Sequence, residues 1–268
     1  MRFFLLQAIL QLIIVQCYAN SGTAKPVTKK DTSFVEFSDS SFLMIAFTGG
    51  FTGKGEVKPE IGSYAGTTGM IVNKVRRFSY HKNIDFHGLV IGSSLTQRKS
   101  IKNAIYYIET HADTNTVIYT YGYSWGGDFA VELAEKLHRK GKKIELLFTV
   151  DATDGPFQNL TVQTKIPDNV RTNYNYYQTM NLGSSSASNF VLKSKKGLNV
   201  GSLNLPGSNG KPNKARNKEK TNVVNCNMTK RDGTYHTNID EKVQEEVEGE
   251  IIKNISGQLK NHVLSSRK

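Results

Sequence analysis

A serine placed between glycines is the most distinctive chemical feature of the chain. The run Gly122-Tyr123-Ser124-Trp125-Gly126 directly follows an apolar, strand-like segment and directly precedes a segment with helical periodicity. On so sharp a turn the Ser124 hydroxyl projects above the sheet, and the flanking glycines let strand and helix approach each other closely. At the start of the helix, the Trp125 amide is placed to donate to a developing oxyanion. The pattern predicts a nucleophile for acyl transfer; a glycine-rich structural turn is the alternative.

In this context the turn resembles the nucleophile elbow of the α/β-hydrolase superfamily, which includes serine esterases, lipases and thioesterases. The resemblance extends from about Phe42 to Val263, and its specific part is the run from Gly122 to Gly126. It implies an α/β-hydrolase fold, in which helices flank both faces of a mainly parallel sheet. It also implies a catalytic triad in which an acid and then a histidine follow the serine along the chain.

The histidine of such a triad takes the proton of the serine hydroxyl. Of the six histidines, His138, His236 and His262 follow Ser124. His138 falls on the helix that begins at the serine, about three turns away, and His262 lies near the C-terminus. The resemblance places the base on a loop after the last strand, which assigns the role to His236. A surface loop histidine is the alternative interpretation of this residue.

The acid of the triad orients the imidazole and stabilises the imidazolium. Some lipases carry it at the end of the strand that follows the nucleophile's helix. In this chain the apolar segment Ile144 to Val150 ends in Asp151-Ala152-Thr153-Asp154. Asp151 stands at the strand tip and is the preferred acid, with Asp154 as the alternative. A turn or helix cap is the other interpretation of either aspartate.

A second oxyanion donor is expected in the loop after the apolar segment Phe42 to Phe47. The sequence Thr48-Gly49-Gly50-Phe51-Thr52-Gly53 resembles the His-Gly-Gly-Gly loop of lipases without its histidine. The resemblance makes the amide of Gly50 or Phe51 the expected donor, beside the amide of Trp125. Loss of one such donor typically lowers the rate by about 10² to 10³.

Strand-like and helix-like segments alternate around these residues. Continuous apolar runs at 42–47, 88–91, 116–121 and 144–150 are typical of strands buried on both faces. Helical periodicity runs from about 97 to 110 and from about 126 to 140. Further strands are expected at 170–178 and 223–228, before a long closing helix with Thr237 or Asn238 as N-cap. The alternation predicts an α/β domain with a mainly parallel sheet; an antiparallel α+β arrangement is the alternative.

Residues 1–19 have the pattern of a secretory signal peptide. Arg2 precedes an apolar run from Phe3 to Val15, and Cys17-Tyr18-Ala19 supplies a cleavage site. We expect export to the periplasm or the extracellular space, and residues 20–268 to form a single domain with a basic, irregular insertion around 181–220. An uncleaved anchor is the alternative, but the run is short for about 30 Å of hydrocarbon and contains two glutamines.

The 268-residue chain is strongly basic, with 35 Lys and Arg against 23 Asp and Glu, a formal net charge of +12. Much of this excess lies in a tract from Lys193 to Lys220 that is also rich in Asn, Gly and Ser. A solvated loop is one interpretation, and a patch that attracts anionic membrane or an acidic polymer is the other. Aromatic residues do not interleave with this tract, so a nucleic-acid partner is not expected.

Several classes of protein are excluded or disfavoured. The two cysteines are too few for a disulfide framework or a cysteine-based zinc site, and neither a metal nor another cofactor is implied. The resemblance implies a secreted serine hydrolase that cleaves carboxylic esters, with an ester or lipid substrate. A thioesterase or peptidase on the same fold is an alternative. Another is a catalytically silent protein that binds anionic membrane or polymer through the basic tract.

Overall fold

The computed structural model describes residues 41–49, 66–92, 97–153, 162–179, 190–193, 199–203, 210–231, 233–236 and 238–265. The chain divides into the units Met1–Glu36 and Phe37–Lys268, and every described residue belongs to the second. The expected signal peptide, Gly50, Phe51, Asp154 and most of the region 181–209 lie outside the described residues.

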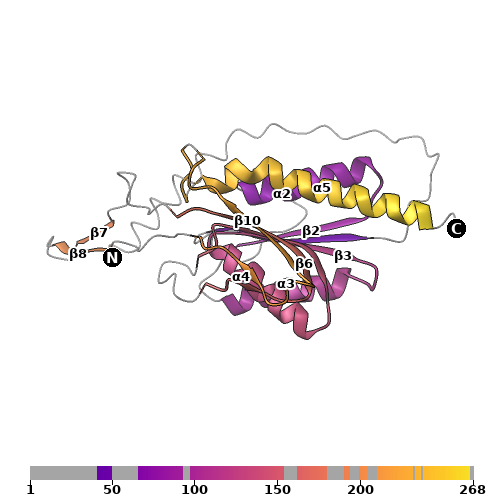
Figure 1. The fold of residues 1–268 in the computed structure, drawn as a ribbon, viewed down its shortest axis with the longest axis horizontal. Helices are drawn as coiled ribbons and strands as arrows, with labels where there is room; N and C mark the ends of the chain where they lie inside the picture. The colour runs from indigo at the N-terminus through magenta and orange to yellow at the C-terminus, as the bar shows by residue number, and fades with distance from the viewer. Residues whose placement is uncertain are drawn as a thin grey trace, which may run out of the picture. The chain divides into compact units, whose positions relative to one another are not determined.

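A six-stranded sheet forms the centre of the fold (Figure 1). Its strands follow the order β10-β6-β4-β3-β1-β2, and every neighbouring pair is parallel. The prediction of an α/β fold with a mainly parallel sheet is therefore confirmed, and each of the predicted strands forms with small shifts at its ends. The strands are β1 (Phe42–Phe47), β2 (Phe86–Ile91), β3 (Val117–Tyr123), β4 (Ile144–Val150), β6 (Val170–Tyr177) and β10 (Asn222–Asn227).

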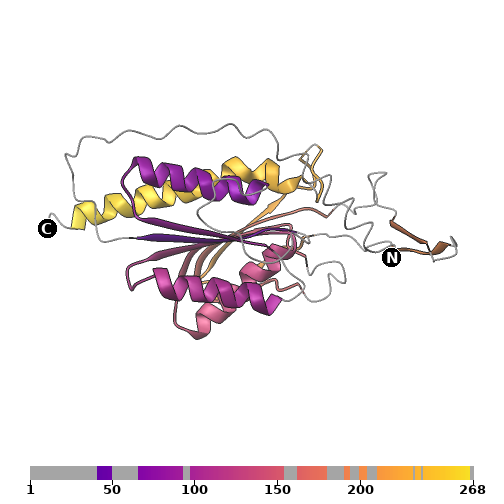
Figure 2. The same ribbon diagram turned by 180° about the vertical axis from the view of Figure 1, so that it is seen from behind.

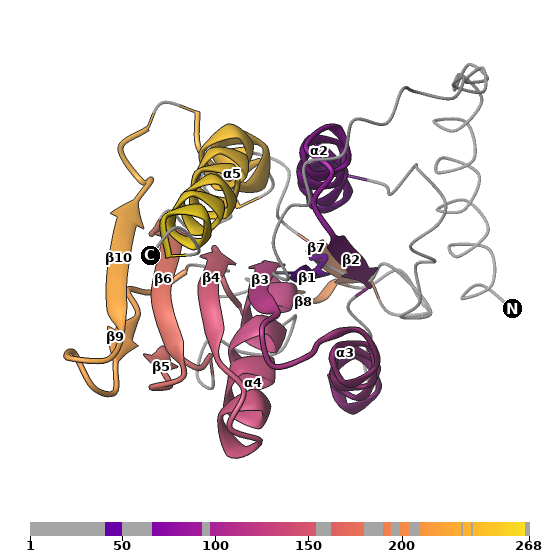
Figure 3. The ribbon, with the colours of Figure 1, turned by 90° about the vertical axis from the view of Figure 1, so that its right-hand side faces the viewer.

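Helices cover both faces of this sheet. Helices α2 (Thr67–His81) and α5 (Ile239–Ser265) lie on one face, and α3 (Gln97–His111) and α4 (Trp125–Arg139) lie on the other (Figures 2 and 3). Sequence analysis predicted α3, α4 and α5 but not α2. Helix α2 buries Ile71, Val72 and Val75, with Phe78 packed against the same core, so its amphipathic pattern was an available signal that the sequence analysis missed.

The apolar run of β1 is explained by its central place in the sheet. Its six residues are fully buried, because alternate side chains point to opposite faces and both faces are covered. Phe42, Met44 and Ala46 join the core beneath α2 and α5, whereas Leu43, Ile45 and Phe47 join the core beneath α3 and α4. Two apolar layers thus fix β1 next to β3, the strand that leads to Ser124.

The crossover from β6 to β10 is irregular where it is described. It contains the antiparallel pair β7 (Phe190–Lys193) and β8 (Asn199–Leu203), and β9 (Lys214–Ala215), which pairs in parallel with β5 (Lys165–Ile166). Polar side chains fasten its last part to the sheet. The Asn213 amide donates to Thr149 Oγ1 at 3.0 Å and to Asn173 Oδ1 at 2.9 Å. These bonds help to bring the neighbouring Gly210 to the end of β4.

Helix α5 begins directly after the loop that carries His236. The carbonyl of Asn238 accepts the first helical bond, from the Lys242 amide at 3.1 Å, which makes Asn238 the N-cap; Thr237, the other predicted N-cap, lies outside the described residues. Residues 239, 243, 247, 251 and 255 are fully buried and form one apolar stripe along the helix, which confirms the predicted closing helix. In the part of the chain that the structure describes, every helix is too short or too polar to cross a membrane.

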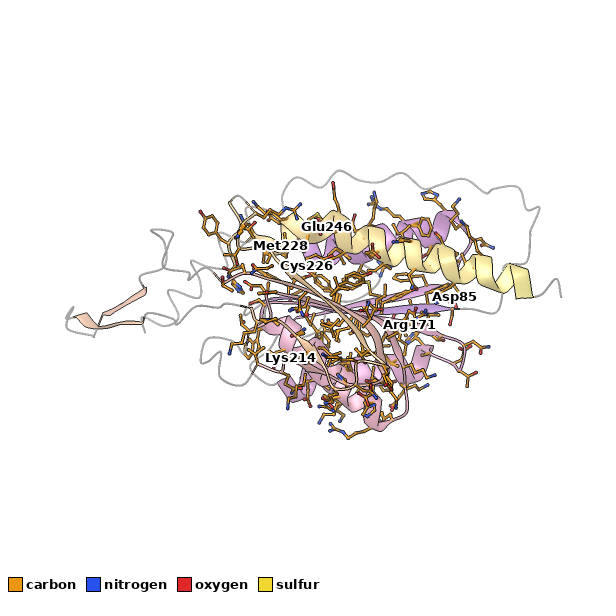
Figure 4. All side chains as sticks on the ribbon, viewed as in Figure 1. Asp85, Arg171, Lys214, Cys226, Met228 and Glu246 are labelled. Atoms are coloured by element: carbon orange, nitrogen blue, oxygen red, sulfur yellow. The ribbon has the colours of Figure 1, made fainter. Side chains whose placement is uncertain are left out.

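The half-buried thiol of Cys226 lies near the end of β10 on the α5 side of the sheet, close to Glu246 and Met228 (Figure 4). Burial, together with the nearby Glu246 carboxylate, raises the pKa of this thiol. The thiolate is the reactive form of cysteine, so this environment disfavours nucleophilic chemistry at Cys226.

Candidate active site

Ser124 occupies the turn between β3 and α4 with backbone angles φ 55° and ψ −124°. L-residues rarely adopt a positive φ, and such strain persists only where the surroundings enforce it. Here the Ser124 amide donates to the Val150 carbonyl at 2.8 Å, and the Ser124 carbonyl accepts from the amides of Gly127 at 2.9 Å and Thr153 at 3.0 Å. Hydrogen bonds on both sides of the residue hold the strained turn in place.

The glycines on either side of the serine are required by close backbone packing. A Cβ atom on Gly122 would lie 2.0 Å from the carbonyl oxygen of Gly126. A Cβ atom on Gly126 would lie 2.6 Å from the carbonyl oxygens of Phe47 and Thr48. Because the obstructing atoms belong to the backbone, β1, β3 and α4 can meet here only with glycine at these positions.

Three side chains from distant parts of the sequence form a hydrogen-bonded chain at this turn. Ser124 Oγ lies 2.8 Å from His236 Nε2, and His236 Nδ1 lies 2.7 Å from Asp151 Oδ2. Ser124 follows β3, Asp151 follows β4, and His236 lies on the loop between β10 and α5. Asp151 is fully buried, and the side chains of Ser124 and His236 are only slightly exposed. The structure therefore brings together the serine, the histidine and the preferred acid of the sequence analysis.

The carboxylate of Asp151 is held by a set of fixed donors. Its Oδ1 accepts from the amides of Gly210 at 2.6 Å and Gln178 at 3.2 Å. Its Oδ2 accepts from Gln178 Nε2 at 2.9 Å as well as from His236. These bonds compensate for the burial of the charge and fix the direction in which the carboxylate faces the imidazole. Sequence analysis missed both Gln178 and Gly210, because each reaches Asp151 through contacts between distant segments that no local signal marks.

The expected oxyanion loop begins beside Ser124. A Cβ atom on Gly49 would lie 3.0 Å from Ser124 Cβ, so the backbone after β1 passes directly beside the serine. Gly50 and Phe51, the predicted donors, lie outside the described residues, as does the alternative acid Asp154. Trp125, the other predicted donor, is the first residue of α4, and its indole packs on Phe129 with ring centroids 5.6 Å apart.

Two further residues that sequence analysis did not single out touch this chain of side chains. The Tyr123 hydroxyl donates to the main-chain carbonyl of His236, and the two rings lie 5.6 Å apart. The buried Thr153 hydroxyl lies 3.4 Å from Ser124 Oγ. Tyr123 was within the predicted elbow, but its partner depends on the path of a loop more than 100 residues away.

The structure also gives the positions of an alternative base and of possible metal ligands. His138 lies in the last turn of α4, at the opposite end of the helix from Ser124. Among the described residues, no cluster of three or more His, Cys, Asp or Glu side chains has the arrangement needed to hold a metal ion.

The described architecture matches the geometry that the sequence resemblance implies. A parallel sheet is flanked by helices on both faces, a serine with positive φ joins a strand to a helix, and the acid and histidine follow it in chain order. The chain has the α/β-hydrolase fold. The turn at Ser124 has the geometry of the elbow that joins a strand to a helix in this fold; its hydrogen-bonded partners are Asp151, directly after β4, and His236, on the loop between β10 and α5.

No protein-family model and no curated protein sequence matches the chain. Similar solved structures include Est1E from Butyrivibrio proteoclasticus, with a TM-score of 0.44, 14% identity and coverage of 82% of this chain and 90% of that one. They also include a serine hydrolase without a lid from Xanthomonas campestris (TM-score 0.37, 10% identity, 77% and 79% coverage). A cutinase-like protein from Cryptococcus sp. is similar with a TM-score of 0.33, 14% identity, and 78% and 91% coverage. Identities this low leave the substrate to be argued from the site itself.

Proposed function

We propose that the protein is a serine hydrolase that cleaves carboxylic esters. The observation that supports this proposal is the continuous hydrogen-bonded chain from Ser124 Oγ through His236 to the buried carboxylate of Asp151, with links of 2.8 and 2.7 Å. A nucleophile, a base within reach of its proton and a group that orients the base are the three parts that acyl transfer at a serine requires.

In the proposed reaction, His236 Nε2 takes the proton of Ser124 as Oγ attacks the ester carbonyl. The tetrahedral oxyanion accepts hydrogen bonds from the Trp125 amide and from the amide of Gly50 or Phe51. Asp151 stabilises the imidazolium, which then gives its proton to the leaving alcohol as the C–O bond breaks. Water, deprotonated by the same imidazole, attacks the acyl-enzyme and releases the carboxylic acid, and the proton returns to Ser124.

The choice of a carboxylic ester rests on the expected compartment. The pattern of residues 1–19 favours an exported protein, and exported proteins seldom meet acyl carriers loaded with thioesters. We therefore propose ester or lipid substrates outside the cytoplasm, with thioesters and peptides as the alternatives on the same chemistry.

An anionic surface is the further partner that we propose. Lys214 of the basic tract lies in register with Lys165 across the β5–β9 pair, and both side chains are exposed. Like charges placed opposite each other repel, and an anionic lipid or polymer would relieve that repulsion. The neighbouring Arg216 is paired with Glu135 of α4, so Lys165 and Lys214 are the more suitable residues for a test.

Fluorophosphonate labelling tests the catalytic proposal without knowledge of the natural substrate. We expect the purified protein to react with the probe and to hydrolyse p-nitrophenyl esters, and Ser124→Ala to do neither. Ser256→Ala is the matched control, because Ser256 lies on α5 and its hydroxyl donates to the Ile252 carbonyl. A wild-type protein that neither reacts with the probe nor cleaves any ester would refute the proposal. Short esters, long-chain lipids, thioesters and peptides compared in one panel would then rank the substrate classes.

A further inference from the structure

We propose that Tyr123 is a positioning residue that holds the main chain of His236 in place while its imidazole transfers protons. This inference rests on the proposed function and extends it to a residue beyond the triad. The structure shows that His236 is held at three points. Asp151 binds Nδ1, Ser124 binds Nε2, and the Tyr123 hydroxyl donates to the His236 carbonyl oxygen.

The His236 loop has few other described connections to the sheet. Its start is tied by the Met228 amide, which donates to the Tyr177 carbonyl at 2.7 Å. Closer to His236, two side-chain hydrogen bonds lie within the loop: the Tyr235 amide donates to Asn238 Oδ1, and Asn238 Nδ2 donates to the Gly233 carbonyl, each at 2.8 Å. These bonds give the loop its shape but do not attach it to β3 or β4. Beside the packing of the buried residues Thr234 and Ile239, the described hydrogen bonds that join His236 itself to the ends of β3 and β4 are those with Tyr123, Ser124 and Asp151.

The contact with Tyr123 differs from the other two because it does not take part in proton transfer. The bond between Ser124 and His236 is broken and remade in each half-reaction, as Ser124 becomes acylated and is then released. A hydrogen bond to the carbonyl holds the backbone of His236 throughout these changes. Its donor belongs to the residue next to the nucleophile, so the same turn fixes both the serine and the base that serves it.

Tyr123 is well suited to remain a donor. Burial raises the pKa of its hydroxyl, and the carboxylates of Asp240 and Asp151 raise it further. The phenol therefore stays protonated throughout the neutral and mildly alkaline pH range.

The variant Tyr123→Phe tests this inference because it removes the hydroxyl and keeps the ring. Tyr119→Phe is the matched control: Tyr119 lies on the same strand and the same face, and its hydroxyl donates to Asn254 Oδ1 of α5 at 2.9 Å. We expect Tyr123→Phe to lower kcat for a p-nitrophenyl ester about tenfold with KM unchanged, as loss of one positioning hydrogen bond would cause. Tyr119→Phe should keep the wild-type kcat and KM, although both variants lose a hydroxyl from the same face of β3.

An NMR measurement on the free protein separates positioning from a general loss of stability. The proton that His236 Nδ1 donates to Asp151 should give a low-field resonance in the wild type and in Tyr119→Phe. It should broaden or disappear in Tyr123→Phe at a temperature where thermal unfolding shows that all three proteins are folded. A Tyr123→Phe protein with the wild-type kcat and a sharp low-field resonance would overturn the inference while leaving the proposed function intact. A wild-type protein that the fluorophosphonate does not label would instead refute the proposed function, and the inference would fall with it.

Discussion

Asparagine at position 151 would keep the shape of the side chain and remove its charge, and the hydrogen bonds around this position determine how His236 responds. The Asp151 carboxylate is surrounded by donors: the amides of Gly210 and Gln178 on Oδ1, and Gln178 Nε2 and His236 Nδ1 on Oδ2. An asparagine side chain has only one acceptor oxygen, so its amide nitrogen must face donors on one side.

The backbone decides which side that is. The amides of Gly210 and Gln178 cannot rotate away, so the asparagine oxygen must take the position of Oδ1 and its nitrogen that of Oδ2. The Gln178 side chain can turn to offer its own oxygen. His236 must then accept at Nδ1, which moves its proton to Nε2, the nitrogen that lies 2.8 Å from Ser124 Oγ. The imidazole becomes a donor to the serine and can no longer take its proton.

We therefore expect Asp151→Asn to lower kcat for a p-nitrophenyl ester by about 10⁴-fold, which is the loss that a wrong histidine tautomer causes in a serine triad. KM should change little, because the ester itself does not touch Asp151. Asp128→Asn is a suitable control, since Asp128 is another buried carboxylate near the start of α4 that accepts from the Gln163 amide. It should keep most of the wild-type kcat, and so should Asp154→Asn. An Asp151→Asn protein that keeps a tenth or more of the wild-type kcat would refute the tautomer argument.

Three further predictions concern stability. Ser124→Gly should unfold at a higher urea concentration, with a free energy of unfolding about 1 kcal/mol above that of the wild type. The reason is that relief of the positive φ at this position outweighs the added entropy of glycine in the unfolded chain. Gly126→Ala should lower the free energy of unfolding by about 3 kcal/mol or more, because its Cβ would meet two backbone carbonyl oxygens at 2.6 Å. Gly249→Ala is the control: this position lies in open space on α5, so the substitution should raise the free energy of unfolding by about 1 kcal/mol in the same urea titration. Burial raises the pKa of Asp240 above its ordinary 3.8, so the folded state holds this proton more tightly than the unfolded state does. Asp240 should therefore contribute stability below pH 3.8 that is lost as pH rises through its raised pKa. Urea titrations across this range should show that the stability of the wild type falls relative to that of Asp240→Asn as pH rises; a constant difference would contradict this assignment.

The parts of the fold that could be predicted from the sequence are those that depend on the pattern of neighbouring residues along the chain. The elbow at Ser124 follows from glycines at fixed spacing between a strand and a helix, and the buried strands follow from continuous apolar runs. Helix α2 was not predicted, although Ile71, Val72, Val75 and Phe78 form an apolar stripe along it. This stripe packs in the core shared with α5 and the sheet.

The surroundings of the acid could not be predicted, because they depend on contacts between distant segments. Gln178 reaches Asp151 through the parallel register of β6 beside β4. Gly210 reaches it because an irregular segment is fastened to the sheet by Asn213. Neither residue has a neighbour in sequence that marks it as part of a site. The same holds for Tyr123, whose role emerges only when the path of the His236 loop is known.

The serine and the acid are joined by the pairing of two adjacent strands, whereas the histidine lies on a loop. Tyr123 and Val150 are in register on adjacent strands, the Ser124 amide donates to Val150, and the Thr153 amide donates back to Ser124. The separation of Ser124 and Asp151 is therefore set by the pairing of β3 with β4, the centre of a buried sheet. His236 arrives on a loop whose shape is largely its own. Under the proposed function, variation in the geometry of the three groups would arise mainly at the histidine, and for this reason we propose that the hydrogen bond from Tyr123 to its backbone contributes more to catalysis than an equal bond elsewhere on the same strand.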